Sequence, residues 1–156
     1  MLDVNRMHQT RTRRIRGDYV LLRADSLHLL VPQRDVLLTE YREQMPQATS
    51  GAGIFTMADA SGTEQPVAAL SSQMTLLEQF PEDRLLLTRF AGAGRRAALA
   101  WSEVRVLIDT ELELHALPDI MRNDAGPIEA YVELDRELAF CTTAQRLFPG
   151  ALAESD

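Results

Sequence analysis

The sequence contains no lysine, so arginine carries every permanent positive charge on its side chains. A Walker-type phosphate loop, a Schiff-base nucleophile and a kinase-type ATP anchor all need the ammonium group of a lysine. Cysteine occurs only once, as Cys141. A single thiol excludes an intramolecular disulfide and a cysteine cluster for zinc or iron–sulfur ligation. These absences exclude several classes of enzyme and metal site, and we predict no cofactor.

Long apolar runs are also absent from the sequence. The first apolar stretch, residues 19–31, is interrupted by Arg23, Asp25 and His28. Such a stretch is too polar to form a signal-peptide core or a membrane span. Together with the lone cysteine, this predicts a cytoplasmic protein with no direct membrane insertion.

Charge is distributed unevenly along the chain. Residues 1–16 contain five arginines and one aspartate, whereas the whole chain has a net charge of −7. A basic arm can bind nucleic acid or another acidic partner, and this remains the alternative function. However, the arm has no aromatic residue for base stacking, and the acidic remainder of the chain repels phosphate. We therefore favour a flexible arm over a nucleic-acid site.

The strongest pattern in the sequence is an internal repeat. Residues 19–38 contain an apolar strand, a polar turn, a second apolar strand and an acidic residue followed by valine, and residues 85–108 repeat this order. Asp35-Val36 in the first copy aligns with Glu103-Val104 in the second. A small β-unit that cannot close its own core gains by packing against a copy of itself. The repeat predicts a scaffold of two packed β-units.

Loop-forming residues divide the chain into three regions. We predict a flexible basic arm over residues 1–17, a folded domain over 18–149 and a C-terminal tail over 150–156. Pro81 and Asp83 interrupt the folded domain, so we place the seam between its two halves at residues 80–84.

Short apolar segments between turns predict a mainly β protein. The expected strands span residues 18–23, 26–31, 53–57, 65–70, 85–90, 96–101, 104–108, 128–134 and 137–141. Residues 35–42 are compatible with a strand or with one helical turn. Ser72 is the expected cap of a helical turn within residues 71–79. Thr142 or Thr143 is the expected cap of a terminal helix that Pro149-Gly150 ends.

The order of these elements resembles that of the CheW-like domain, the coupling module of bacterial chemosensory systems. The resemblance covers roughly residues 18–149 and lies in the order and spacing of weak apolar motifs. The matching positions are Leu30-Val31-Pro32 with Val36, Gly53-Ile54 with Pro66-Val67 and Leu70, Leu99-Ala100 with Val104 and Val106-Leu107, Leu117-Pro118, and residues 134–138 followed by Gln145-Arg146-Leu147.

The resemblance implies both a fold and a function. The fold is two intertwined, five-stranded SH3-like β-barrels related by a pseudo-repeat, with a hydrophobic seam between them and a short C-terminal helix. The function is that of a non-enzymatic adaptor in chemotaxis signal transduction. Such an adaptor binds the regulatory domain of a histidine kinase and, through a groove between the barrels, the cytoplasmic tip of a chemoreceptor.

The segment that would face a receptor departs from the family pattern. Ala58 or a neighbour stands where the family usually carries arginine, and Ala69 stands where an aspartate is common. A methyl group cannot replace the forked donors of a guanidinium. The partner is therefore left open between a receptor and another array protein. By position, the residues expected to bind a partner are Val36, Phe55, Thr56, Met57, Ala58 and Asp59.

The residues that most often carry chemistry do not form a recognisable site. His8, His28 and His115 share no metal-ligand spacing with one another or with Cys141. Cys141 alternates with Ala139, which is typical of a buried strand residue rather than a reactive thiol. Trp101 is expected in the core, and its alternative role is that of an interface anchor.

Overall fold

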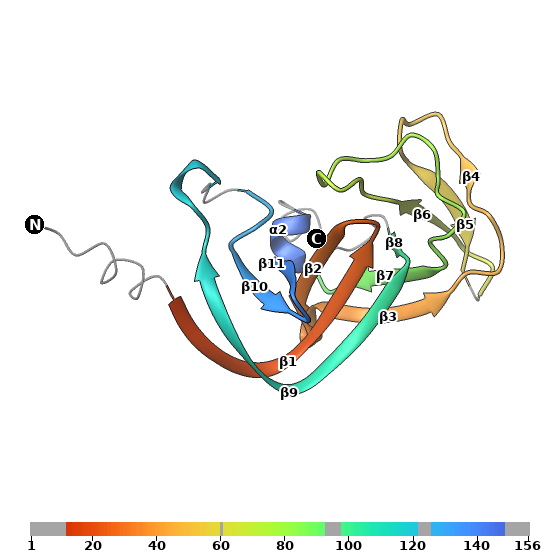
Figure 1. Ribbon diagram of the computed structural model, residues 1–156. Coiled ribbons are helices and arrows are strands. Elements are labelled where there is room, and N and C mark those ends of the chain that lie inside the picture. The colour runs from red at the N-terminus through yellow and green to blue at the C-terminus, as the bar shows by residue number, and fades with distance from the viewer. Residues whose placement is uncertain (1–11, 60, 93–97, 122–125, 149–156) are drawn as a thin grey trace, which may run out of the picture.

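The computed structural model describes residues 12–59, 61–92, 98–121 and 126–148, which form two adjoining β-units (Figure 1). The first unit is a closed five-stranded barrel and the second is a six-stranded sheet. The barrel contains, in spatial order, β1 (Thr12–Ala24), β2 (Leu27–Pro32), β11 (Glu137–Cys141), β10 (Ala130–Leu134) and β9 (Glu103–Ala116). The sheet contains β3 (Val36–Tyr41), β7 (Leu86–Phe90), β8 (Ala98–Trp101), β6 (Glu64–Ala68), β5 (Phe55–Ala58) and β4 (Gln47–Ala48).

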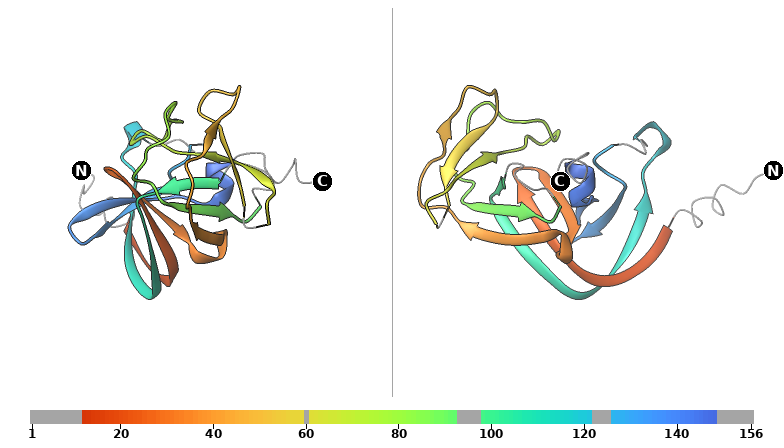
Figure 2. Two further views of the ribbon diagram at one scale, coloured as in Figure 1. Left: turned by 90° about the vertical axis from the view of Figure 1, so that its right-hand side faces the viewer. Right: turned by 180° about the vertical axis from the view of Figure 1, so that it is seen from behind.

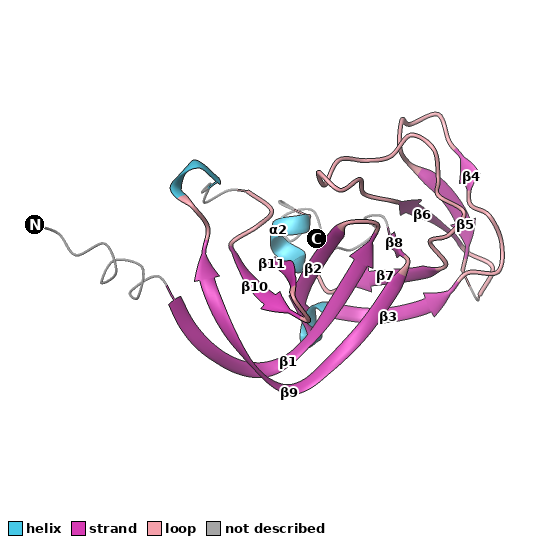
Figure 3. Cartoon of the chain, in the orientation of Figure 1, coloured by secondary structure: helices cyan, strands magenta, loops and turns pink. Residues whose placement is uncertain are grey.

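Among the described residues, helical structure is confined to short segments (Figure 3). They are the 3-10 turns η1 (Gln33–Asp35) and η2 (Asp119–Met121) and the helix α2 (Ala144–Leu147). The described part of the chain contains no helix with the length and apolar character that crossing a membrane requires. The predicted mainly β fold is confirmed. The second unit has one strand more than expected, because the two-residue β4 pairs with β5.

The two units exchange segments of the repeat. Each unit combines a hairpin from one copy with later strands from the other, so β1-β2 joins β9–β11 and β7-β8 joins β3–β6. Both junctions are parallel strand pairs, β2 with β11 and β8 with β6. The predicted seam at residues 80–84 divides the sequence repeat, whereas the chain passes between the units at η1 and at Ser102.

Strand β1 begins within the segment that the sequence suggested was a flexible arm. It pairs with β9 from Thr12 opposite His115 to Gly17 opposite Thr110. Arg14 and Arg16 form ion pairs with Glu111 at 3.5 and 3.6 Å. Residues 12–17 are thus strand rather than arm, because β9 supplies both a hydrogen-bonding ladder and matching carboxylates. Residues 1–11 and the predicted tail, residues 150–156, lie outside the described residues.

The two units share one hydrophobic core. Barrel residues such as Leu22 and Leu29 pack with Phe90 and Leu99 of the sheet. Trp101 is fully buried among them, and its indole N–H donates to the Thr88 hydroxyl at 2.7 Å. The prediction that Trp101 belongs to the core is confirmed. A shared core of this kind makes each unit depend on the other for burial.

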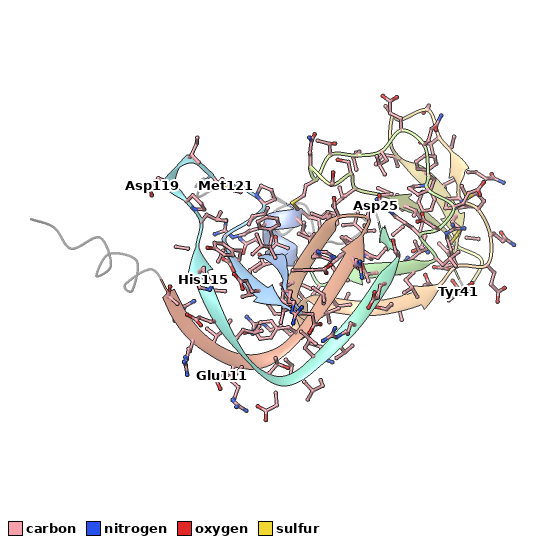
Figure 4. The ribbon with its side chains drawn as sticks, in the orientation of Figure 1. Asp25, Tyr41, Glu111, His115, Asp119 and Met121 are labelled. Atoms are coloured by element: carbon pink, nitrogen blue, oxygen red, sulfur yellow. The ribbon has the colours of Figure 1, made fainter. Side chains whose placement is uncertain are left out.

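A buried arginine adds a polar connection between the units. The Arg84 side chain is fully buried, and its guanidinium donates to the Leu70 carbonyl at 2.5 Å and to the Asp25 carboxylate at 2.9 Å. Asp25 lies in the β1–β2 turn of the barrel, as Figure 4 shows, whereas Leu70 follows β6 of the sheet. The arginine therefore connects the barrel to the loops of the sheet.

The two predicted helical segments have different outcomes. The Thr143 hydroxyl accepts from the Arg146 N–H at 3.2 Å, which confirms this residue as the cap of α2. In contrast, residues 71–75 form a turn without a helix. The Ser71 hydroxyl, not that of Ser72, accepts from the Gln73 and Thr75 N–H groups and holds the chain in that turn.

Candidate functional site

The two histidines of the barrel, His28 and His115, and Cys141 each have different neighbours and do not form one site. His28 Nε2 lies 3.3 Å from a carboxylate oxygen of Glu137, and the His115 ring stacks on Tyr131. Cys141 is buried, and desolvation raises its pKa to about 12, with a further contribution from Glu129. Its thiol is therefore protonated at neutral pH and a poor nucleophile. The described residues contain no group of three histidine, cysteine or acidic side chains able to hold a metal ion.

Strand β5 carries most of the residues that the sequence assigned to partner binding. Phe55 is only 7% exposed and packs edge-on against Phe80 in the core of the sheet, with ring centroids 5.3 Å apart. The Thr56 hydroxyl donates to Glu64 at 2.7 Å, and Met57 is half-buried over the same core. Ala58 is exposed. The accessible part of the predicted surface therefore begins at Thr56.

Asp59 organises the turn that follows β5. Its Oδ1 accepts from the Ser61 N–H, the Ser61 hydroxyl and the Thr63 N–H at 2.6 to 3.0 Å. These hydrogen bonds, led by the one from the Ser61 hydroxyl, hold the pKa of the Asp59 carboxyl below its ordinary value. Asp59 is therefore a charged turn residue with a defined orientation.

A polar network connects this turn to strand β3 across the sheet. Arg89 of β7 lies 3.8 Å from the Asp59 carboxylate, and its Nε donates to the side-chain Oε1 of Gln65 at 2.7 Å. The Gln65 amide in turn donates to Glu40 of β3 at 3.2 Å. These contacts join β3 to β6 and β7 to the turn after β5, so the sheet is curled and its first strand approaches its fifth.

The curled sheet leaves a cleft of about 360 Å³, which we call the β3–β5 cleft. It is lined by Glu40, Tyr41, Arg42, Glu43 and Gln44 on one side and by Met57, Ala58 and Asp59 on the other. The Tyr41 side chain is 64% exposed and projects from the outer end of β3 (Figure 4). Three of the six predicted partner-binding residues thus lie on one wall of a single cleft.

Arg42 fixes the shape of the other wall. Its guanidinium donates to the backbone carbonyls of Gln44, Glu82 and Arg84 at 2.7 to 3.0 Å and stacks over the Phe80 ring. Arg42 is 6% exposed, so its charge is directed into the protein. The accessible side chains of this wall are therefore Glu40, Tyr41, Glu43 and Gln44.

Val36 lies away from the other predicted residues. It opens β3 opposite Phe90 and packs on the core shared by the two units, whereas Phe55 and Met57 pack on the separate core of the sheet. Next to it, Leu37 and Leu38 are 67% and 47% exposed. The structure therefore separates the six predicted residues into a group on β5 and the turn after it, and a single position at the start of β3.

Comparison with known proteins supports the architecture. No protein-family model matches the sequence, and no curated protein matches it. The structure is similar to that of the scaffolding protein TtCheW from Thermoanaerobacter tengcongensis, with a TM-score of 0.59 and 14% sequence identity. The similarity covers 86% of this chain and 94% of that protein. The chain therefore has a CheW-like fold.

Proposed function

We propose that the protein is a non-enzymatic adaptor of a bacterial chemosensory array, which couples a CheA-type histidine kinase to receptors or to other array proteins. The observation that carries the proposal is the exchanged pair of β-units, since 86% of the chain follows the architecture of a scaffolding protein. The shared core packs the two units against each other, which suits a scaffold that presents surfaces of both units to its partners.

The alternative, a nucleic-acid-binding barrel, loses support in the structure. It relied on a free arginine-rich arm, but Arg14 and Arg16 face Glu111 and Asp109 on the neighbouring strand. Figure 4 shows Glu111 on the outer bend of β9. Carboxylates at these distances offset the positive charge that a phosphate backbone would need.

The proposal is tested by calorimetric titration of the full chain with the regulatory domain of the CheA-type kinase from the same genome. We expect saturable binding with a micromolar or tighter dissociation constant. Absence of binding at micromolar concentrations, with the chain shown to be folded, contradicts the adaptor function.

The partner surface is tested with a matched pair of variants. Ala58→Trp places bulk on the exposed end of β5, and Ile120→Trp does the same at a 95% exposed position between two barrel strands. If β5 contacts a partner, we expect Ala58→Trp to weaken kinase or receptor binding at least about tenfold, while Ile120→Trp leaves it unchanged. If the two variants bind the kinase and the receptor with equal affinity, the binding surface does not include the end of β5.

A further inference from the structure

The second β-unit is open along one side, in contrast to the closed barrel of the first. Its strand order begins with β3 and ends with β4. Strand β4 pairs only with Phe55 and Thr56, so among the described residues no strand covers the outer edge of β5 at Met57 and Ala58. The outer edge of β3 is likewise uncovered in the described part of the chain.

The β3–β5 cleft lies between these two uncovered edges. Backbone N–H and C=O groups on a strand edge readily pair with another extended chain. Natural edge strands are usually protected by charged side chains, proline, β-bulges or a covering loop. In β3 the register irregularity lies at the start of the strand, between Val36 and Leu38, and the Glu40 carboxylate accepts from Gln65 of β6. The backbone at the end of β3 therefore keeps a regular edge that a segment of opposite charge to Glu40 can approach.

The charges that line the cleft are mainly negative. Glu40, Glu43 and Asp59 contribute carboxylates, whereas the one lining cation, Arg42, directs its guanidinium onto backbone carbonyls. Arg89 offsets part of the charge of Asp59 from 3.8 Å. Tyr41 and Met57 add apolar surface between the acidic positions. An extended segment that fits both features has cationic and apolar side chains.

We propose that the β3–β5 cleft binds an extended partner segment that carries arginine beside apolar side chains, and that this segment adds as a strand to the edge of β3. The inference rests on the adaptor function proposed above, because it assigns the chemistry of one partner contact. We assign the segment to another protein, because the adaptor function requires a partner and β1 of the same chain begins at the opposite end of the molecule from β5 (Figures 1 and 2).

The first test uses a fluorescein-labelled peptide of alternating arginine and valine as the probe and the full chain as the receptor. We expect it to bind at least about tenfold more tightly than the matched glutamate–valine peptide. Methylation of alternate backbone nitrogens keeps the charge but removes hydrogen-bond donors, so it should weaken binding by about tenfold. Equal binding of the acidic peptide overturns the charge assignment, and equal binding of the methylated peptide overturns strand addition.

The second test locates the binding site with a matched pair of variants. Glu43 and Glu133 are both exposed, but Glu133 lies on β10 of the other unit. We expect Glu43→Arg to lower the affinity for the arginine peptide at least about fivefold. Glu133→Arg should leave this affinity within about twofold of the wild-type value. In heteronuclear NMR spectra of the wild type, the peptide should shift amide signals of residues 38–43 and 57–59. Shifts spread over all acidic surfaces would show non-specific attraction and overturn the proposal.

The outcomes separate this inference from the adaptor function. Kinase binding without peptide binding overturns the cleft assignment alone, whereas peptide binding at the cleft without kinase or receptor binding overturns the adaptor function alone. Self-association of the full chain that disappears when residues 1–11 are deleted, together with cleft-specific signal shifts on association, would identify a second copy as the occupant. That result would overturn the assignment to another protein.

Discussion

Arg84 shows how much one side chain can couple the two units. A buried guanidinium that loses its carboxylate retains the cost of desolvation without the compensating ion pair. Its partner Asp25 is itself 62% exposed, so solvent exposure alone would rank the aspartate as unimportant. The contribution of Asp25 depends instead on the complete burial of the group that it neutralises.

The substitution of Asp25 should therefore lower stability more than the exposure of this residue indicates. We expect Asp25→Asn to lower the free energy of unfolding by about 1 to 2 kcal/mol, because the substitution removes the charge opposite a buried cation. Urea denaturation followed by circular dichroism measures the loss.

Asp135→Asn is the matched control for this prediction. Asp135 also has a positive φ in a β-turn and pairs with an arginine at 2.8 Å, but Arg105 is 46% exposed. We expect a loss below about 0.5 kcal/mol for that exposed pair. Equal losses in the two variants would show that burial of Arg84 does not strengthen its ion pair.

The buried thiol of Cys141 should make the stability of the folded state depend on pH in alkaline solution. Its pKa rises from 9.0 in the unfolded reference to about 12 in the protein, so the folded state keeps the proton when the unfolded state releases it. The associated stability is complete below pH 9 and is lost as the pH rises from 9 towards 12.

The cysteine can be isolated by substitution. Between pH 8 and about 10.5 we expect the wild type to lose about 1 to 2 kcal/mol more stability than Cys141→Ala, as measured by urea midpoints. Burial and the charge of the Cys141 thiolate both raise the pKa of Tyr19, so the difference between the two proteins includes this coupling to the thiol. Parallel pH profiles for the two proteins would contradict the assignment of this loss to the thiol.

The sequence predicted the roles of some side chains correctly and missed those of others. The Thr143 cap and the burial of Trp101 depend on local pattern and on hydrophobicity, and both were predicted correctly. The burial of Arg84 was not predicted, because nothing local distinguishes it from a surface arginine. Phe55 was assigned to a partner surface, but Phe80, distant in sequence, covers it.

At the scale of elements, the loop before β5 depends on close contact with a second loop. Gly53 has a φ of +76°, and a Cβ added there would lie 2.8 Å from the Leu76 Cβ. The backbone conformation and the contact both require glycine. The loop thereby determines where β5 and the wall of the β3–β5 cleft begin.

Substitution at this position should therefore loosen β5. We expect Gly53→Ala to cost about 2 kcal/mol or more, from backbone strain combined with overpacking against Leu76. Gly51→Ala is the control, since its added Cβ would have no heavy atom nearer than 3.7 Å. Thermal denaturation compares the two variants, and a neutral Gly53→Ala would show that the loop can rearrange freely.

Among the elements, local strands were predictable and their partners were not. Short apolar segments bounded by turn residues located β2, β7 and β11 nearly to their ends, because the turn residues mark where each strand stops. The extension of β1 to Thr12 depends on pairing with β9, about 100 residues later. For the same reason the β3–β5 cleft was not predicted, since Glu40 and Met57 meet only when the sheet curls.

At the scale of the whole molecule, the first half of β1 is part of the barrel rather than an appendage. Ile15 packs on the barrel core opposite Leu112. We expect deletion of residues 1–17 to lower the free energy of unfolding by at least about 2 kcal/mol, because it removes this burial and the strand ladder. Deletion of residues 1–11 leaves every described strand pair in place and should have a smaller effect on the urea midpoint.

The exchange of segments between the units also sets an order of events during synthesis. The sheet is encoded by residues 36–101, whereas the barrel needs β11, which ends at Cys141. A ribosome therefore releases all strands of the sheet while the barrel still lacks three of its five. Until β11 has been synthesised, β1 and β2 have no closed barrel to join, and their apolar faces are candidates for chaperone capture in the nascent chain.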